Sequence, residues 1–268
     1  MVNAAQPFSP HPASPARSCR IGLKFMSSRH AKSCIVAILQ SNYIPWKGYF
    51  DIIARSDKFI LFDNVQYTKR DWRNRNKIKT ANGELWLTIP VEHKGEQRIS
   101  EVMVANRFWP DKHWTSIERA YGKAAGFNDF APRLRELYEL CRDMDQLSAV
   151  NRLFITSICE FLGLNTQLFW STDLLPVAVM DAADPTDRLV ELCVAAGADT
   201  YLSGPAARAY LDEERFLSAG IRVEWMDYSG YLCYPQRHGE FTHTVSVLDL
   251  LLNVGNNSRR YLKYAGES

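Results

Sequence analysis

A densely basic segment, YTKRDWRNRNKIKT, carries the clearest chemical signal in this sequence. Arg73, Arg75 and Lys77 recur at every second position, and side chains at that spacing share one face of an extended strand. A guanidinium can bind a phosphate or carboxylate through two parallel hydrogen bonds, whereas an ammonium acts as a point charge. Asp71 and Trp72 distinguish the segment from a plain solvated surface, since Asp71 can pair with an arginine and orient it. The segment therefore predicts a clamp for an anion.

The other side chains of this segment are expected on the opposite face. If the segment is extended, the face opposite the basic side chains carries Trp72, Asn74, Asn76 and Ile78. Lys79 is expected on the basic face, two positions after Lys77. The competing interpretation is an ordinary charged surface, because most runs of charge are solvated.

The polar loop QSNYIPWKGYF follows a continuous apolar run and is a second candidate site. It is expected to open into a helix, whose free N–H groups and dipole favour an anion such as a phosphate. Alternatively, it is a rigid aromatic loop that closes a β–α unit. The H-x-G-H motif of nucleotidylyltransferases is absent, and Lys47, Gly48 and Tyr49 stand in its place. The polar and aromatic candidates here are Gln40, Asn42, Tyr43, Lys47 and Tyr49.

A third group of candidates lies toward the C-terminus, in YLSGPAARAY and YPQRHGEFTHTVSVLDLL. Ser203 and Gly204 follow a strand-like run, and a glycine there lets a ligand approach the backbone closely. Histidine titrates nearest neutrality, so His243 is the expected general base, with Asp249 or Asp63 orienting it. The competing interpretation is that His243 caps a helix. The remaining polar candidates for substrate binding are Gln66, Asn74 and Gln236.

The absence of several well-known motifs argues against the kinds of site that these motifs mark. The sequence contains no G-x-S-x-G elbow, P-loop or G-x-G-x-x-G fingerprint, which argues against a serine hydrolase, a P-loop ATPase and a dinucleotide dehydrogenase. His238 and His243 lack a third residue at a metal-binding spacing, so no metal site is expected. The residues specify no cofactor.

The composition is that of a globular chain without a membrane span. Of 268 residues, 46% are apolar, and the formal net charge is +2. That balance argues against general nucleic-acid binding, so any basic function is local. No apolar run reaches the ~20 residues of a membrane-spanning helix. Scattered cysteines without a C-x-x-C pair fit the reduced thiols of a cytoplasmic protein.

Residues 1–32 differ from the rest of the chain in composition. They are rich in Pro, Ser, Ala and Arg, show no periodicity and lack the apolar core of a signal peptide. We therefore expect a disordered arm over 1–32, with Met26 as an alternative start, and one folded domain over 33–268.

Short apolar runs alternate with amphipathic segments, which predicts an α/β fold. The runs 34–40 and 58–63 flank a short helical segment, and such a β–α–β unit favours parallel strands. A hairpin and a mainly helical insertion across about 110–165 follow. The helix expected over 184–197 has an Asp N-cap, a Pro at its first position and a Gly stop. Further strands are expected at 166–172, 200–204 and 221–228, and a C-terminal helix at 244–255.

These elements together predict a Rossmann-like α/β domain, with a mainly parallel sheet and flanking helices. Sheets of this kind bind ligands beyond the carboxyl ends of their strands. The polar residues that follow the strands are therefore expected on one rim.

The chain resembles the WbqC-like protein family over about 35–255. The resemblance is carried by LQSNYIPWKGYFDIIARSDKFILFDNVQYTKRDWRNRNKIKT, by WLTIPV, by HWTSIERAYGKAAGF, and by YLSGPAARAYLD with EWMDYSGYLCYPQRHGEFTHTVSVLDLLLNVG. One departure is Ala125, where relatives usually carry proline, and it affects a helix end. The family-like positions are Gln40, Tyr43, Pro45, Gly48, Tyr49, Asp63, Gln66, Asp71, Trp72, Arg73, Asn74, Arg75, Lys77, His113, Tyr121, Ser203, Gly204, Gln236, His243, Ser246 and Asp249.

The resemblance implies a role in bacterial surface-polysaccharide (O-antigen) or nucleotide-sugar metabolism. We expect a transferase that moves an acyl or aminoacyl group to an amino sugar or similar acceptor. In this interpretation Arg73, Arg75 and Lys77 hold a phosphate-bearing donor, and Tyr43, Tyr49 and Trp72 are aromatic walls for a base or sugar ring. The alternatives are a nucleotidylyl- or adenylate-forming enzyme, or a binding protein without catalysis in polysaccharide assembly. The partner is a small anionic substrate, and the sequence leaves the oligomeric state open.

Overall fold

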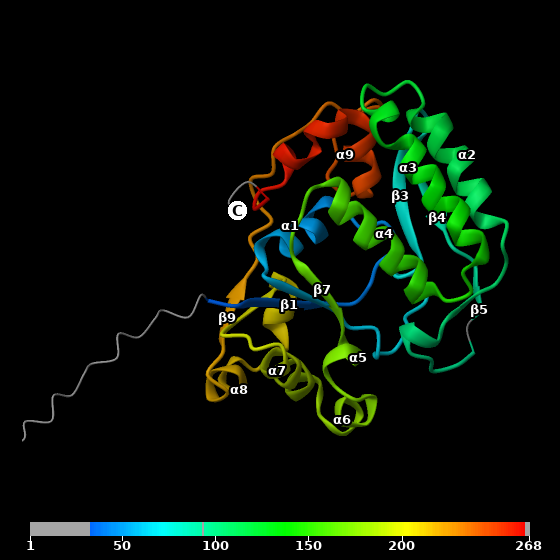
Figure 1. Ribbon diagram of the computed structural model, residues 1–268. Helices are drawn as coiled ribbons and strands as arrows, with labels where there is room; N and C mark the ends of the chain where they lie inside the picture. The colour runs from blue at the N-terminus through cyan, green and yellow to red at the C-terminus, as the bar shows by residue number, and fades with distance from the viewer. Residues whose placement is uncertain (1–32, 93, 266–268) are drawn as a thin grey trace, which may run out of the picture. The chain divides into compact units, whose positions relative to one another are not determined.

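A five-stranded parallel sheet forms the centre of the computed structural model, which describes residues 33–92 and 94–265 (Figure 1). The strand order is β7-β2-β1-β8-β9. At its centre, Ala37 of β1 lies opposite Phe59 on one side and Leu202 on the other. This sheet and its flanking helices confirm the predicted Rossmann-like α/β fold. The strands are β1 (Ile35–Leu39), β2 (Lys58–Leu61), β7 (Gln167–Trp170), β8 (Thr200–Ser203) and β9 (Arg222–Trp225).

Helices cover both faces of the sheet because its strands are apolar on both sides. On one face, Val36 and Ile60 share a core with helices α6 (Val177–Ala182), α7 (Pro185–Ala195) and α8 (Glu213–Ser218). On the other face, Ala37 and Phe59 share a core with α1, α4 and α9. These last helices are α1 (Lys47–Arg55), α4 (Leu147–Phe161) and α9 (Val247–Val254).

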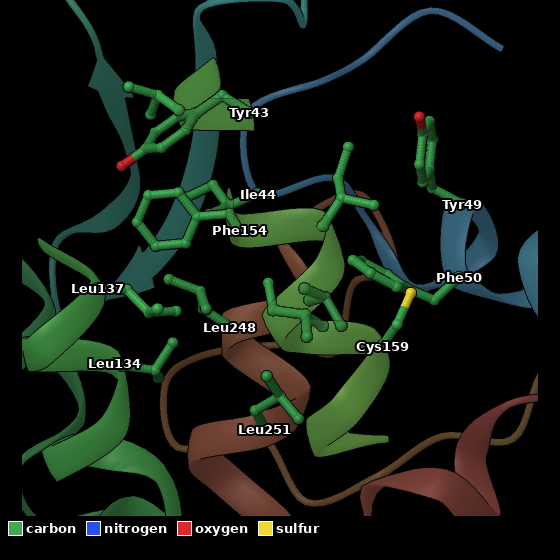
Figure 2. Packing of buried hydrophobic residues seen from close by; sticks show 14 of the residues in the cluster. Tyr43, Ile44, Tyr49, Phe50, Leu134, Leu137, Phe154, Cys159, Leu248 and Leu251 are labelled. Atoms are coloured by element: carbon green, nitrogen blue, oxygen red, sulfur yellow. The ribbon is translucent and has the colours of Figure 1, made fainter. Parts of the chain in front are cut away.

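The core on the α1, α4 and α9 side is built largely from aromatic and leucine side chains (Figure 2). Figure 2 shows Phe154 of α4 between the ring of Tyr43 and the α9 leucine Leu248. The rings of Tyr43 and Phe154 meet edge to face, with centroids 5.6 Å apart. This packing fixes the loop after β1, which carries several candidate residues.

The predicted helical insertion is present between β2 and β7 (Figure 1). It follows the predicted hairpin, whose strands β3 (Arg75–Thr80) and β4 (Gly83–Thr88) pair antiparallel. Two further short strands, β5 (Val91–Glu92) and β6 (Met103–Val104), pair with each other. The insertion contains α2 (Trp109–Tyr121), α3 (Phe127–Leu140) and α4, with 3₁₀ segments at Ile99–Glu101 and Cys141–Asp143.

Helix ends follow the predicted capping signals where these are strong. The side chain of Asp184 accepts the N–H groups of Thr186 and Asp187 at the start of α7, and Gly197 has a φ of 72° beyond its end. Ser246 caps α9 in the same way, through the N–H of Leu248. The helix α5 (Ser171–Leu174) and the helix α6 were not predicted, because helices this short show no clear periodicity. Two more 3₁₀ segments span Pro205–Ala209 and Gly255–Tyr261.

In the part of the chain that the structure describes, every helix is too short or too polar to cross a lipid bilayer. The predicted disordered arm over 1–32 lies outside the described residues.

Candidate functional site

Polar residues follow the carboxyl ends of three neighbouring strands. Gln40 follows β1, and Asp63 lies two residues after β2. Ser203 ends β8, and Gly204 follows it. Strand β1 pairs with β2 on one side and with β8 on the other, so the chain changes direction along the sheet at β1. In open parallel sheets, ligands bind in the crevice at this switch point. The structure thus brings the predicted residues from β1, β2 and β8 to one rim.

A cavity of about 320 Å³, the switch pocket, lies at this point of the rim. Gln40, Ser203 and Gly204 contribute to its wall, as the sequence predicts. Arg188 and Tyr210 also line it, and sequence reasoning missed both. The available signal for Arg188 was its place near the start of α7, the helix that precedes β8.

Arg73 is the best-connected cation of the basic segment. Its guanidinium donates hydrogen bonds to the side-chain oxygens of Gln40 and Asn42. The carboxylate of Asp71 lies 3.7 Å from Arg73 Nη2, which matches the orienting role expected for it. The Arg73 carbonyl accepts a hydrogen bond from Asn151 Nδ2 of α4 at 2.9 Å. Arg73 is therefore held against the loop after β1 rather than extended into solvent.

A second cavity, the tryptophan pocket, has a volume of about 270 Å³. Trp72 leaves 43% of its surface exposed, so one of its faces is open to a ligand. The two pockets are linked, because Arg73 binds Gln40 in the wall of one and Asn42 in the wall of the other. The tryptophan pocket is lined by Asn42, Pro45, Trp46, Trp72, Asn76 and Thr244.

The predicted row of basic side chains is divided in the structure. Arg75 and Lys77 share one face of β3, where their cationic groups lie 4.2 and 5.7 Å from the ring centroid of Trp86. Lys77 Nζ also donates to Glu84 at 2.6 Å. Arg73 does not join them, because β3 begins only at Arg75 and the two-residue alternation does not extend before it.

The alternation also fails at both ends of the segment. Trp72 is exposed rather than buried with Asn74, Asn76 and Ile78, and Lys79 is buried rather than exposed. Lys79 Nζ turns inward to donate to the side-chain oxygen of Gln236 at 2.8 Å.

Asn74, a predicted binding residue, is buried, and so is Asn76 two positions later. Asn74 donates to the carbonyl of Ile89 at 2.9 Å. Asn76 donates to the carbonyl of Ile44 at 3.0 Å, where the backbone has a φ of 37°. That conformation is unusual for a β-branched residue, so Asn76 supports a strained turn in the loop after β1. Gln66 is exposed and pairs through its backbone with Arg98, and it lines neither pocket.

The two tyrosines predicted as pocket walls lie in the core. Tyr43 is fully buried, and its hydroxyl lies 2.7 Å from Tyr138 Oη and 2.9 Å from His113 Nδ1. Tyr49 is also buried and donates to the Gln40 carbonyl at 2.9 Å. Burial raises the pKa of both hydroxyls well above the usual range. They therefore position the loop after β1 rather than contact a ligand in either pocket.

Acid is expected to destabilise the protein through His113. Burial lowers the pKa of His113 from 6.5 to about 4, so the unfolded chain binds a proton in this range while the folded protein does not. The free energy of unfolding is highest above the pKa that His113 has in the unfolded chain. It falls as the pH drops toward the pKa of His113 in the folded protein, by about 3 kcal/mol for a shift of this size. Urea unfolding at neutral and mildly acidic pH measures the loss. His113→Gln should show a flatter pH dependence, and an equal slope in both proteins would contradict this assignment.

The start of α1, predicted as an anion site, is covered by protein. The Trp46 indole packs so closely on Gly48 that a Cβ added there would come within 2.2 Å of Trp46 Cζ2. Lys47 is only 3% exposed and donates to the carbonyl of Leu232 at 3.1 Å. Its Nζ lies 4.6 Å from the centroid of the Tyr231 ring, and burial lowers its pKa to about 8. A phosphate would have to displace these groups to reach the helix N-terminus.

His243, the predicted general base, is half-buried beside the tryptophan pocket. Its neighbour Thr244 lines that pocket, and its Nδ1 atom is buried without a hydrogen-bond partner. Burial and the charge of Lys47 lower the pKa of His243. Both effects favour the neutral imidazole, which is the form that a general base requires.

The residues predicted to orient His243 have other partners. Asp249 is fully buried and accepts hydrogen bonds from Tyr121 at 2.8 Å and from Tyr234 and Gln236 at 2.9 Å. Asp63 accepts the backbone N–H of Ser41 at 2.8 Å. The structure thus brings Gln236 to Asp249, but it brings neither carboxylate to His243.

These features define a Rossmann-like α/β protein with two linked pockets at and beside the switch point of its sheet. The WbqC-like protein family matches residues 40–261, and the chain belongs to this family. The chain is 48% identical over 232 residues to the uncharacterized protein Rv1507c of Mycobacterium tuberculosis (strain ATCC 25618 / H37Rv). That match covers 85% of this chain and 97% of the relative. No solved structure matches the chain.

Proposed function

We propose that this protein is a group transferase of bacterial surface-polysaccharide or nucleotide-sugar metabolism. It moves an acyl or aminoacyl group to an amino sugar or similar acceptor. The observation that carries the proposal is the position of Arg73, whose guanidinium binds one residue from each of two pockets. A transferase has to hold two substrates with their reacting groups close together, and two linked pockets meet that requirement.

In this proposal the switch pocket takes the anionic donor. Arg188 supplies a cation in the wall of this pocket, and Gly204 lets a ligand approach the backbone. Arg73 does not line the pocket itself, but it binds Gln40 of the wall and pairs with Asp71. The N–H donors that its partners leave unused can bind a phosphate that reaches past Gln40. A donor with a diphosphate fits this charge better than a neutral one.

The tryptophan pocket takes the acceptor in this proposal. The faces of Trp46 and Trp72 suit a sugar ring, whose C–H groups pack on aromatic surfaces. His243, next to Thr244 of this pocket, acts as the general base on the acceptor amine or hydroxyl. Nucleotide sugars are cytoplasmic metabolites, so the proposal assigns the enzyme to the cytoplasm.

Isothermal titration calorimetry tests the donor assignment. Acetyl-coenzyme A, succinyl-coenzyme A and a non-hydrolysable aminoacyl-adenylate are titrated into the protein, with glucose and adenosine as controls that lack phosphate. We expect at least one phosphate-bearing donor to bind, and neither control. If no donor binds, or if the controls bind equally well, the proposal is wrong.

Two enzyme assays on the same preparation test the reaction class. ATP–pyrophosphate exchange would identify an adenylate-forming enzyme instead, because a transferase that uses a preformed donor does not catalyse this exchange. If a donor binds and no panel of amino-sugar acceptors is turned over, the protein is a binding protein instead.

A further inference from the structure

A third cavity lies at the carboxyl ends of β2 and β7, where α5 begins. Figure 1 shows α5 at the end of β7. This cavity, the serine pocket, has a volume of about 220 Å³, which suits a small ligand or one group of a larger one. Its wall carries one carboxylate, and its other polar groups are neutral hydroxyls, amides and the indole N–H of Trp170. It is lined by Leu61, Asp63, Asn64, Ser100, Gln146, Ser148, Trp170, Ser171 and Thr172.

The carboxylate in this wall belongs to Asp63 and has half of its hydrogen-bonding capacity unused. Asp63 Oδ1 accepts the backbone N–H of Ser41, whereas Asp63 Oδ2 is buried without a hydrogen-bond partner. The residue is only 4% exposed, and burial raises its pKa. A buried carboxylate oxygen without a donor is costly, so this position calls for a donor from outside the chain.

A second buried oxygen without a donor belongs to the same network. Asn151 Nδ2 donates to Ser41 Oγ at 3.1 Å, while Asn151 Oδ1 has no partner. Ser41 thus joins the two side chains whose oxygens are unpaired. Ser148, which lines the pocket, precedes Asn151 by one turn of α4 and shares its helix face.

The charges around Asp63 leave room for a cation. Arg73 lowers the pKa of the carboxyl through its charge, but its guanidinium is bonded to Gln40 and Asn42 and pairs with Asp71. Asp63 therefore has no ion pair within the described residues. Those residues also contain no group of three or more His, Cys, Asp and Glu side chains that could hold a metal ion.

We propose that the serine pocket binds the primary ammonium group of a substrate, with Asp63 Oδ2 as its charged acceptor and serine hydroxyls as further acceptors. An ammonium carries three N–H donors and no acceptor, so one carboxylate among neutral oxygens matches its needs. The inference rests on the proposed function for the identity of the amine, which is the amino group of the aminoacyl donor or a sugar amine that is not the acceptor, because the acceptor amine reacts beside His243. It also gives Asp63 a binding role in place of orienting His243.

Ligand pairs that differ only in the ammonium test the site without any mutation. Ligand-observed NMR titrations compare glucosamine with N-acetylglucosamine, and glycinamide with N-acetylglycinamide. We expect at least one amine to bind at least tenfold more tightly than its acetylated partner. If neither amine binds, or if the acetylated partners bind equally well, the inference is wrong.

Asp63→Asn identifies the acceptor, because it keeps the shape of the side chain and removes its charge. We expect the affinity for the bound amine to fall at least tenfold, while Glu160→Gln, an exposed site on α4 with the same change of charge, leaves it unchanged. An unchanged affinity in Asp63→Asn would overturn the assignment. Ser100→Leu narrows the pocket and removes one of its hydroxyls, while the backbone N–H that donates to the Asp63 carbonyl is kept, so it should weaken amine binding as well; unchanged binding would contradict the location of the site.

The two proposals fail separately. If amines do not bind but donors still bind in calorimetry, the ammonium site is wrong and the transferase proposal stands. If amines bind through Asp63 but no donor binds, the ammonium site stands and the transferase proposal is wrong.

Discussion

Replacing Arg73 with methionine is expected to weaken donor binding by about 30- to 100-fold, or roughly 2–3 kcal/mol, which is the usual worth of hydrogen bonds to a charged group. Methionine keeps much of the aliphatic length of arginine but removes the cation that bonds to Gln40 and Asn42. Without it, the switch pocket loses its link to the tryptophan pocket. Calorimetry with whichever donor binds the wild-type protein measures the change.

Two further variants test whether donor binding depends on the charge of Arg73, on its hydrogen-bonding geometry, or only on the basic character of the whole segment. Arg73→Lys keeps the charge but cannot bond to both Gln40 and Asn42, so we expect an intermediate affinity. Arg75→Met removes a neighbouring guanidinium that packs on Trp86 and bonds to the Arg70 carbonyl rather than to a lining residue of either pocket, so donor binding should be unchanged. Equal losses in Arg73→Met and Arg75→Met would show that the segment acts as a diffuse basic surface, against this account.

Replacing Asp249 with alanine is expected to lower the free energy of unfolding by about 3–5 kcal/mol, the range for removing one partner of a buried charged network. The donors of Tyr121, Tyr234 and Gln236 would be left buried without their acceptor. Because Gln236 also binds Lys79, the loss would reach the hairpin as well. Urea unfolding with a two-state fit measures the effect.

A matched carboxylate on the surface provides the control for Asp249. Asp227 pairs with Lys263 but leaves 60% of its side chain exposed, so Asp227→Ala should change the stability by less than about 1 kcal/mol. The sequence suggested instead that Asp249 orients the catalytic His243. If Asp249→Ala keeps full stability and loses only turnover, that earlier assignment is correct and the structural role is wrong.

The sheet and its helices could be predicted from local sequence because each signal acts within a few residues. The run CIVAILQ is apolar at every position except its last, which fits a strand buried on both faces. In α7, the cap Asp184, the following proline and the terminal Gly197 specify both ends without any tertiary contact. The family was also evident from the sequence, since its motifs lie in long contiguous blocks.

The site could be predicted less completely because it depends on contacts between distant segments. The alternation of the basic segment assumed a strand from residue 72, whereas Arg73 precedes β3 and is drawn to Gln40 and Asn42, 33 and 31 residues earlier. His243 and Asp249 are close in sequence, but Asp249 points from α9 into the protein core. There it accepts hydrogen bonds from the hydroxyls of two buried tyrosines. Asn151 was missed, although a polar residue within the apolar stripe of α4 was the available signal.

A crystal structure of the protein with a bound phosphate-bearing acyl donor tests the central claim most directly. The account predicts that the phosphates lie in the switch pocket beside Gln40 and Gly204, within reach of Arg73, and that the acyl group points toward the tryptophan pocket. A donor bound on the Trp86 face with Arg75 and Lys77, with both pockets empty, would contradict it.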